Sequence, residues 1–91
     1  MTLLIEILCA PDDADTLVDA LREHGIDTWI TLQPIEIAPA SLEHASVRER
    51  VTGRRKRTAL RFLGENPALD VVRDVVEDGT VWHAIDVAAQ S

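Results

Sequence analysis

The chain of 91 residues has little of several residue types, and each shortage narrows what it can be. Cys9 is its one cysteine, so no internal disulfide can form, and such a count is typical of a reducing compartment. With no tyrosine, one phenylalanine and two tryptophans, it offers few rings for stacking on nucleic-acid bases. No apolar run approaches the roughly 18 residues of a membrane span. No basic segment precedes the apolar run Leu3-Leu4-Ile5, so we expect no signal peptide and a cytoplasmic location.

What the chain does have is the composition of one globular domain. Hydrophobic residues make up 46% of it, which is too many for a disordered segment. A domain of this length buries only about 60–65% of its unfolded surface and gains stability from oligomerisation. We therefore expect a single domain over residues 1–91 that associates with copies of itself.

Charge is unevenly distributed along the sequence. The net charge is −7, which argues against general binding of nucleic acid. However, seven of the nine basic residues lie between positions 48 and 61, where Glu49 is the one acid. The rest of the chain is strongly acidic. A basic segment sorted this sharply indicates an anionic ligand or an acidic partner.

The first half of the chain reads as strand, helix, strand. Alternation predicts a strand over residues 2–9, with Leu3, Ile5, Ile7 and Cys9 on one face. Asp12 is a suitable N-cap for a helix over about 12–24, which Gly25 ends. Alternation resumes over 26–37 and predicts a second strand. A polar segment follows to Gly53, part of which, roughly 42–51, favours a turn of helix.

The second half repeats the order. Residues 56–64 have strand character, and Asn66-Pro67 predicts a helix with Asn66 as its N-cap and Gly79 as its stop. A last strand is predicted over 81–87. The order βαββαβ indicates an α+β, ferredoxin-like fold, with a four-stranded antiparallel sheet and both helices on one face.

This architecture leaves one face of the sheet without helices. The residues that we expect there are apolar, namely Leu4, Leu8, Trp29 or Ile30, and Trp82. A contiguous apolar patch usually marks an interface, so we expect this face to be buried in an oligomer. The alternative is a set of ordinary exposed residues covered in part by the segment 38–53.

Several short motifs resemble those of the PII-like signalling proteins, over most of the chain. Ala10-Pro11 follows the first strand, His24-Gly25-Ile26 opens the second, and Asp78-Gly79-Thr80-Val81-Trp82 leads into the last, all at the spacing of that family. The segment 38–56 then occupies the place of the mobile T-loop. The run 51–57 resembles a shorter branch of the family, some of whose members accompany heavy-metal efflux pumps.

The resemblance implies a homotrimer with its sheets packed inward and ligands bound between subunits. It implies a non-enzymatic regulator whose loop reports the presence of a ligand, such as ADP or ATP with or without bicarbonate, to a membrane transporter or an enzyme. The chain departs from the family at three points. Ile35–Pro39 replaces a glycine-rich loop base, Thr80 replaces a phosphate-binding lysine, and no tyrosine is present for uridylylation.

The basic cluster is the predicted ligand site: Gly53, Arg54, Arg55, Lys56 and Arg57. Arginine forks match bidentate oxyanions such as phosphate. Because side chains alternate along a strand, at most two of the four cations point into one site. Arg54 with Arg57, or Arg55 with Lys56, are the pairs that we expect to hold phosphate. The alternatives are a solvated edge strand protected by charge, or pairing with acids of a neighbouring subunit.

Histidine and cysteine offer a second, weaker hypothesis, in which the chain is a metal-binding trimer linked to metal efflux. His44, with Cys9 as a further ligand, is the residue that we expect to bind metal. His24 fits a helix C-terminus and His83 a strand position near the core. No nucleophile with a supporting base is apparent, so we do not expect an enzyme. A domain that only assembles, without any ligand, is the third hypothesis.

Overall fold

Four strands and two helices follow one another in the predicted βαββαβ order, in a computed structural model that describes residues 1–38 and 55–87. The first half contains β1 (Leu3–Cys9), a 3-10 turn η1 (Pro11–Asp13), α1 (Ala14–Glu23) and β2 (Ile30–Ile37). The second half contains β3 (Arg55–Gly64), α3 (Asn66–Val75) and β4 (Val81–Asp86). Most of the expected T-loop at 38–56, including the helical turn expected at 42–51, lies outside the described residues.

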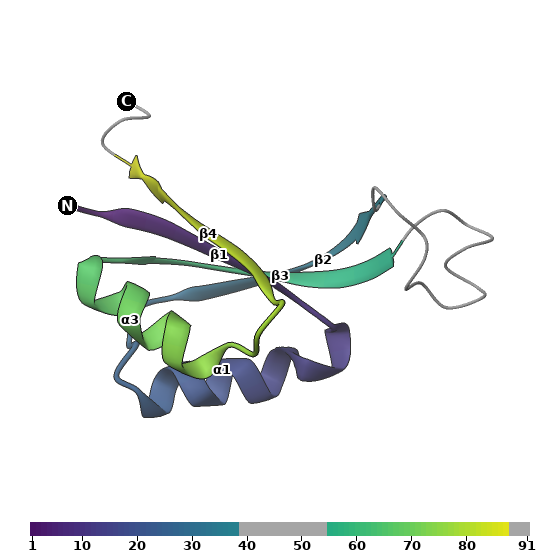
Figure 1. Cartoon of the computed structure of the whole chain (residues 1–91), viewed down its shortest axis with the longest axis horizontal. Helices are drawn as coiled ribbons and strands as arrows, with labels where there is room; N and C mark the ends of the chain where they lie inside the picture. Colours follow the sequence, from purple (N-terminus) through teal and green to yellow (C-terminus); the bar gives the residue numbers. More distant parts are fainter. Residues whose placement is uncertain (39–54, 88–91) are drawn as a thin grey trace.

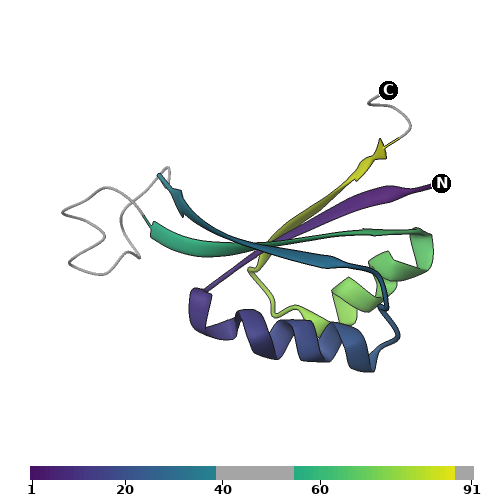
Figure 2. The same cartoon turned by 180° about the vertical axis from the view of Figure 1, so that it is seen from behind.

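The four strands form one sheet in the order β2-β3-β1-β4, and all three strand pairs are antiparallel. β1 and β3 are therefore the central strands, while β2 and β4 form the edges. Figures 1 and 2 show α1 and α3 side by side against the same face of this sheet. The predicted α+β, ferredoxin-like fold is confirmed.

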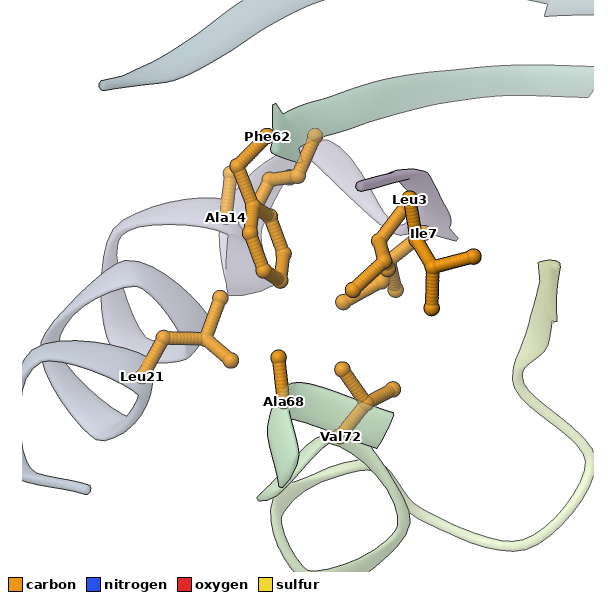
Figure 3. Packing of buried hydrophobic residues seen from close by; sticks show 9 residues of the cluster. Leu3, Ile7, Ala14, Leu21, Phe62, Ala68 and Val72 are labelled. Carbon is orange, nitrogen blue, oxygen red and sulfur yellow. The ribbon is translucent and has the colours of Figure 1, made fainter. Parts of the chain in front are cut away.

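The core lies between the sheet and the two helices (Figure 3). Alternation in β1 directs Leu3, Ile5 and Ile7 toward the helices, where each is buried. β3 adds Leu60 and Phe62, which lie opposite Ile7 and Ile5 in the antiparallel register. The helices complete the cluster with buried residues of their inner faces: Ala14, Leu21, Ala68 and Val72.

Both helices begin at a different residue from the one that we expected. Pro11 starts a tight turn directly after β1, in which the amide of Asp13 donates to the Ala10 carbonyl at 3.0 Å. Asp13, not Asp12, is therefore the N-cap residue of α1. Glu65 likewise takes the N-cap position of α3 in an extended conformation. Within the described ranges, neither helix has the length and apolar composition needed to cross a membrane.

The second strand is shorter than expected because its predicted first residues are used in the turn after α1. The Arg22 guanidinium donates to the carbonyl oxygens of Ile26 and Thr28, at 2.9 and 2.6 Å. The Thr28 hydroxyl donates to the Leu63 carbonyl at 3.0 Å. These bonds hold the connection against β3 without a strand ladder, and β2 begins only at Ile30.

Helix α3 is also shorter than expected, since it ends at Val75 rather than at Gly79. Val76 has an extended backbone and packs against the core, although its amide still donates to the Val72 carbonyl at 3.0 Å. Gly79 lies three residues further on with φ of +87°, in the turn before β4. This left-handed backbone explains why a glycine stands there.

The register of β4 reverses two of our expectations. Trp82 lies opposite Ile7, so it packs against the core on the helix side, with the Arg73 Cζ 5.8 Å from its ring centroid. His83 lies opposite Glu6 on the other face, where its side chain is 49% exposed. The prediction that Trp82 occupies the face without helices and His83 the neighbourhood of the core is therefore wrong.

Two leucines that face each other across β2 and β3 test this description of the core. Leu60 is 0% exposed and its partner Leu32 is 43% exposed on the same face. Leu60→Ala should lower the free energy of unfolding by about 3 kcal/mol, because it leaves a cavity under both helices. The matched control Leu32→Ala should cost about 1 kcal/mol or less. Urea unfolding measures both, and equal losses would contradict the placement of the core.

Candidate functional site: a basic hollow beside an open sheet face

The face of the sheet that carries no helices, here called the open face, is largely apolar at both of its ends. Among its exposed side chains, Val81 is 60%, Leu63 49% and Ile85 37% exposed. Trp29, which is 93% exposed, borders a groove of about 490 Å³ together with Leu4 and Leu63. Residues this apolar are unusual on a surface that meets only water.

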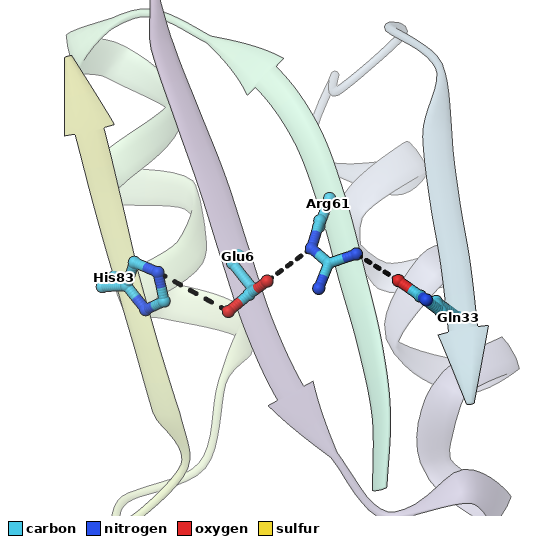
Figure 4. Close-up of polar contacts among 4 residues, drawn as sticks. All are labelled: Glu6, Gln33, Arg61 and His83. Carbon is cyan, nitrogen blue, oxygen red and sulfur yellow. Dashed lines mark hydrogen bonds and ion pairs between the residues drawn. The ribbon is translucent and has the colours of Figure 1, made fainter. Parts of the chain in front are cut away.

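A row of polar side chains crosses the middle of the open face, one from each strand (Figure 4). Glu6 of β1 accepts from the Arg61 Nε of β3, and Arg61 Nη1 donates to the Gln33 amide oxygen of β2. On the other side of Glu6, the His83 Nε2 of β4 lies 3.5 Å from its second carboxylate oxygen. These four residues are called the polar line below.

The polar line is organised so that its charges balance one another. The Glu6 side chain is only 19% exposed, and that of Arg61 is 35% exposed. Burying a carboxylate and a guanidinium that already form a hydrogen-bonded ion pair costs less free energy than burying the two charges separately. The open face therefore exposes apolar side chains at both ends and is nearly neutral across the middle, while Arg55 and Arg57 lie on the same side at the end where β3 begins.

A second feature is a hollow of about 300 Å³ at the end of the sheet where β2 ends and β3 begins. Parts of the chain that are distant in sequence meet there: the end of β1, the turn into α1, the adjoining ends of β2 and β3, and the turn before β4. It is called the basic hollow below, and its lining comprises Leu8, Cys9, Ala10, Asp13, Ile37, Arg55, Arg57, Asp78, Gly79, Thr80 and Val81.

Two of the predicted ligand-binding residues, Arg55 and Arg57, line the basic hollow together. They are two positions apart on β3, so their side chains share a face, while Lys56 is exposed on the other face opposite Glu36. The expected pairing of Arg55 with Lys56 is therefore not the one that the fold produces. Arg54 and Gly53 lie outside the described residues, and their role stays a prediction.

Two of the charged groups of the hollow, Asp13 and Arg57, act on the Cys9 thiol. Burial raises the pKa of this thiol, the Asp13 carboxylate raises it further, and the Arg57 guanidinium lowers it. The Cys9 Sγ lies 3.7 Å from the Thr58 carbonyl, to which a protonated thiol donates weakly. Cys9 is therefore held as the thiol, which favours a packing role over a nucleophilic one.

The residues predicted to bind metal are not brought together in the described part of the chain. His44 lies outside it, and the described residues contain no group of three or more side chains able to hold a metal ion. His24 is the C-cap residue of α1, as expected, and its Nδ1 lies 2.8 Å from the Ala20 carbonyl oxygen.

Sequence reasoning missed two acids of the basic hollow, Asp13 and Asp78. Asp13 was assigned to the start of a helix, and it reaches the hollow because the turn at Pro11 brings that helix back beside β1. Asp78 belongs to the Asp78–Trp82 motif, which carried the family resemblance without a chemical role. A hollow with two arginines and two acids fits a ligand that has both an anionic part and hydrogen-bond donors.

Comparison with solved structures places this geometry in a known fold. B. subtilis GlnK, a PII protein, has a TM-score of 0.66 and 13% identity, and the match covers 96% of this chain and 85% of that one. The complex of B. subtilis GlnK with ATP gives 0.65 and 12%, with 94% and 82% covered. A DUF3240 family protein from Shewanella baltica gives 0.67 and 14%, with 94% and 89% covered.

The chain therefore has a PII-like fold, as the sequence motifs indicated. No family model and no curated protein matches its sequence. At 12–14% identity, these likenesses concern the fold.

The convergence of Asp13 and Arg57 on Cys9 is testable through the reactivity of the thiol. Asp13→Asn should lower the pKa of Cys9 and speed its alkylation at a fixed pH, because a nearby negative charge is removed. Arg57→Gln should raise the pKa and slow the reaction. The pH dependence of the rate with iodoacetamide measures both, and the control is Lys56→Gln, which removes a positive charge that is not among those acting on the pKa of Cys9. Shifts in the same direction for Asp13→Asn and Arg57→Gln would contradict the described geometry.

Proposed function

We propose that this chain is a non-enzymatic, PII-like regulatory protein that assembles as a homotrimer and binds a small anionic ligand in the basic hollow. The ligand class that fits is an adenine nucleotide, ADP or ATP, with or without bicarbonate. Binding is signalled through the segment 38–56 to a transporter or an enzyme. The observation that carries the proposal is the pair of arginines, Arg55 and Arg57, on one side of the hollow.

The chemistry of the hollow supports an oxyanion ligand. Two guanidinium groups at positions i and i+2 of a strand lie on the same side of the sheet, and the planar fork of an arginine matches the oxygens of a phosphate. Gly79 and Thr80, in the turn before β4, also line the hollow, and the Thr80 side chain adds a hydroxyl. The hollow is open to one side, so a second copy of the chain is able to complete the enclosure of a nucleotide.

The open face supports assembly. Helices cover one side of the sheet, and the other side exposes Leu63, Val81 and Ile85 around a polar line whose charges are paired. A chain of this length gains from burying such a surface. Packing the open faces of several copies against one another covers the apolar ends and excludes water from the polar line.

The position of the arginines supports signalling through the segment 38–56. Arg55 belongs to the last residues of that segment and Arg57 directly follows it, both at the start of β3, so a ligand held by them would act on the end of the loop. A ligand changes the conformation of the loop only as far as it binds one conformation more tightly than another. The loop state favoured by the ligand then binds or releases the partner.

Calorimetric titration with ADP, ATP and inorganic phosphate tests the ligand site. Arg55→Gln/Arg57→Gln should weaken nucleotide binding by roughly a hundredfold to ten-thousandfold, since each of the two charge-assisted hydrogen bonds that are lost contributes about 1.5–3 kcal/mol. The matched control Lys56→Gln removes one positive charge from the neighbouring, outward-facing position and should keep most of the affinity. Binding to the unchanged protein should also weaken as salt is added.

Other outcomes separate the remaining hypotheses. If only net charge mattered, Lys56→Gln, which removes one charge, would lose about half as much binding free energy as Arg55→Gln/Arg57→Gln, which removes two, and a loss of this size or larger would contradict the assignment of the hollow. Absence of nucleotide binding, combined with metal binding that His44→Ala removes, would instead support the metal-binding hypothesis. An assembled protein that binds neither would support the domain without a ligand.

A further inference from the structure

The polar line contains two titratable groups, the Glu6 carboxylate and the His83 imidazole, and imidazole is the side chain whose charge ordinarily changes between about pH 5 and 8. With a neutral His83, the line sums to zero, because the Glu6 carboxylate is matched by the Arg61 guanidinium. The imidazole of His83 lies 3.5 Å from a carboxylate that is already paired. Its protonation therefore gives the line a net charge of +1, because one carboxylate is then shared between two cations.

We propose that His83 makes the self-association of this chain sensitive to pH, so that copies pack through their open faces when the imidazole is neutral and separate when it is protonated. This inference rests on the proposed assembly through the open face. The inference goes beyond the proposed assembly because it identifies a residue that regulates that assembly.

The direction follows from the position of His83 in the sheet. On β4 its neighbours on the open face are Val81 and Ile85, both apolar and exposed, so a packed partner covers the imidazole as well. The charged groups facing it are Glu6 on β1 and, beyond Glu6, Arg61 on β3. Burying an uncompensated charge is costly, so the assembled state favours the neutral imidazole.

The sign of the effect follows from linkage. If the assembled state admits only the neutral imidazole, association weakens as the pH falls and the free side chain takes up a proton, and this loss is repeated for each copy that joins. General charge acts in the opposite direction, because the chain carries −7 at pH 7 and acid reduces this repulsion. Self-association that weakens in acid therefore indicates the protonation of a specific group rather than the change in net charge.

Sedimentation velocity over a range of protein concentrations, at about pH 8 and about pH 5.5, measures this. The chain has three histidines, so two variants separate their effects. His83→Gln keeps a hydrogen-bond donor beside Glu6 and should remain equally associated at both pH values. His24→Gln/His44→Gln leaves His83 as the one imidazole and should dissociate in acid as the unchanged protein does.

The outcomes distinguish this inference from the proposed function. A chain that is monomeric at both pH values overturns the proposed assembly and this inference with it. A chain that associates equally at both pH values, or a His83→Gln variant that still dissociates in acid, overturns the inference alone. Circular dichroism at both pH values shows whether each variant is folded, and unfolding of the unchanged protein near pH 5.5 would also contradict the account.

Discussion

The fold depends on the alternation of side chains in β1, which is hydrogen-bonded to a strand on each side. Because β1 is central, its two sets of residues lie in the middle of the two faces of the sheet. Ile5 and Ile7 on one face provide the floor on which both helices pack, and neither is exposed. Glu6 lies between them in sequence and is therefore directed to the middle of the opposite face.

A carboxylate in that position needs partners from the adjacent strands, and the registers of β3 and β4 supply them. Arg61 and His83 are the residues directly opposite Glu6 on its two sides. The same alternation in β3 directs Arg57 and Arg55 to the side of the sheet that Arg61 occupies, at the end where the strand begins. The basic hollow and the polar line are thus two consequences of one strand pattern.

Much of the fold was predictable from the sequence because β1 and both helices have one clearly apolar face. β4 was different: Trp82 alternates with His83, and each set contains an apolar and a polar residue. Only its register with β1 decides which set faces the helices. The helix starts were displaced for local reasons, since Pro11 begins a tight turn at once and Glu65 remains extended.

The site was predictable in part. Charge sorting located the basic segment, and Arg55 and Arg57 indeed line a hollow. Basic residues of β3 share one side of the sheet when their positions differ by an even number. The sequence predicts this only if the bounds of the strand are known to the residue. The contributions of Asp13 and Asp78 depend on two turns that bring distant segments together, and no local pattern reports such a contact. The segment that carries positive charge was therefore foreseeable, whereas the composition of the walls of the hollow was not.

The central claim is that the open face is covered by copies of the same chain and that the basic hollow holds a nucleotide beside it. Native mass spectrometry at neutral pH, with and without added ADP or ATP, tests this most directly. The account predicts a trimer that takes up nucleotide, and an Arg55→Gln/Arg57→Gln trimer that takes up much less. A monomer that remains unliganded at every nucleotide concentration would contradict it.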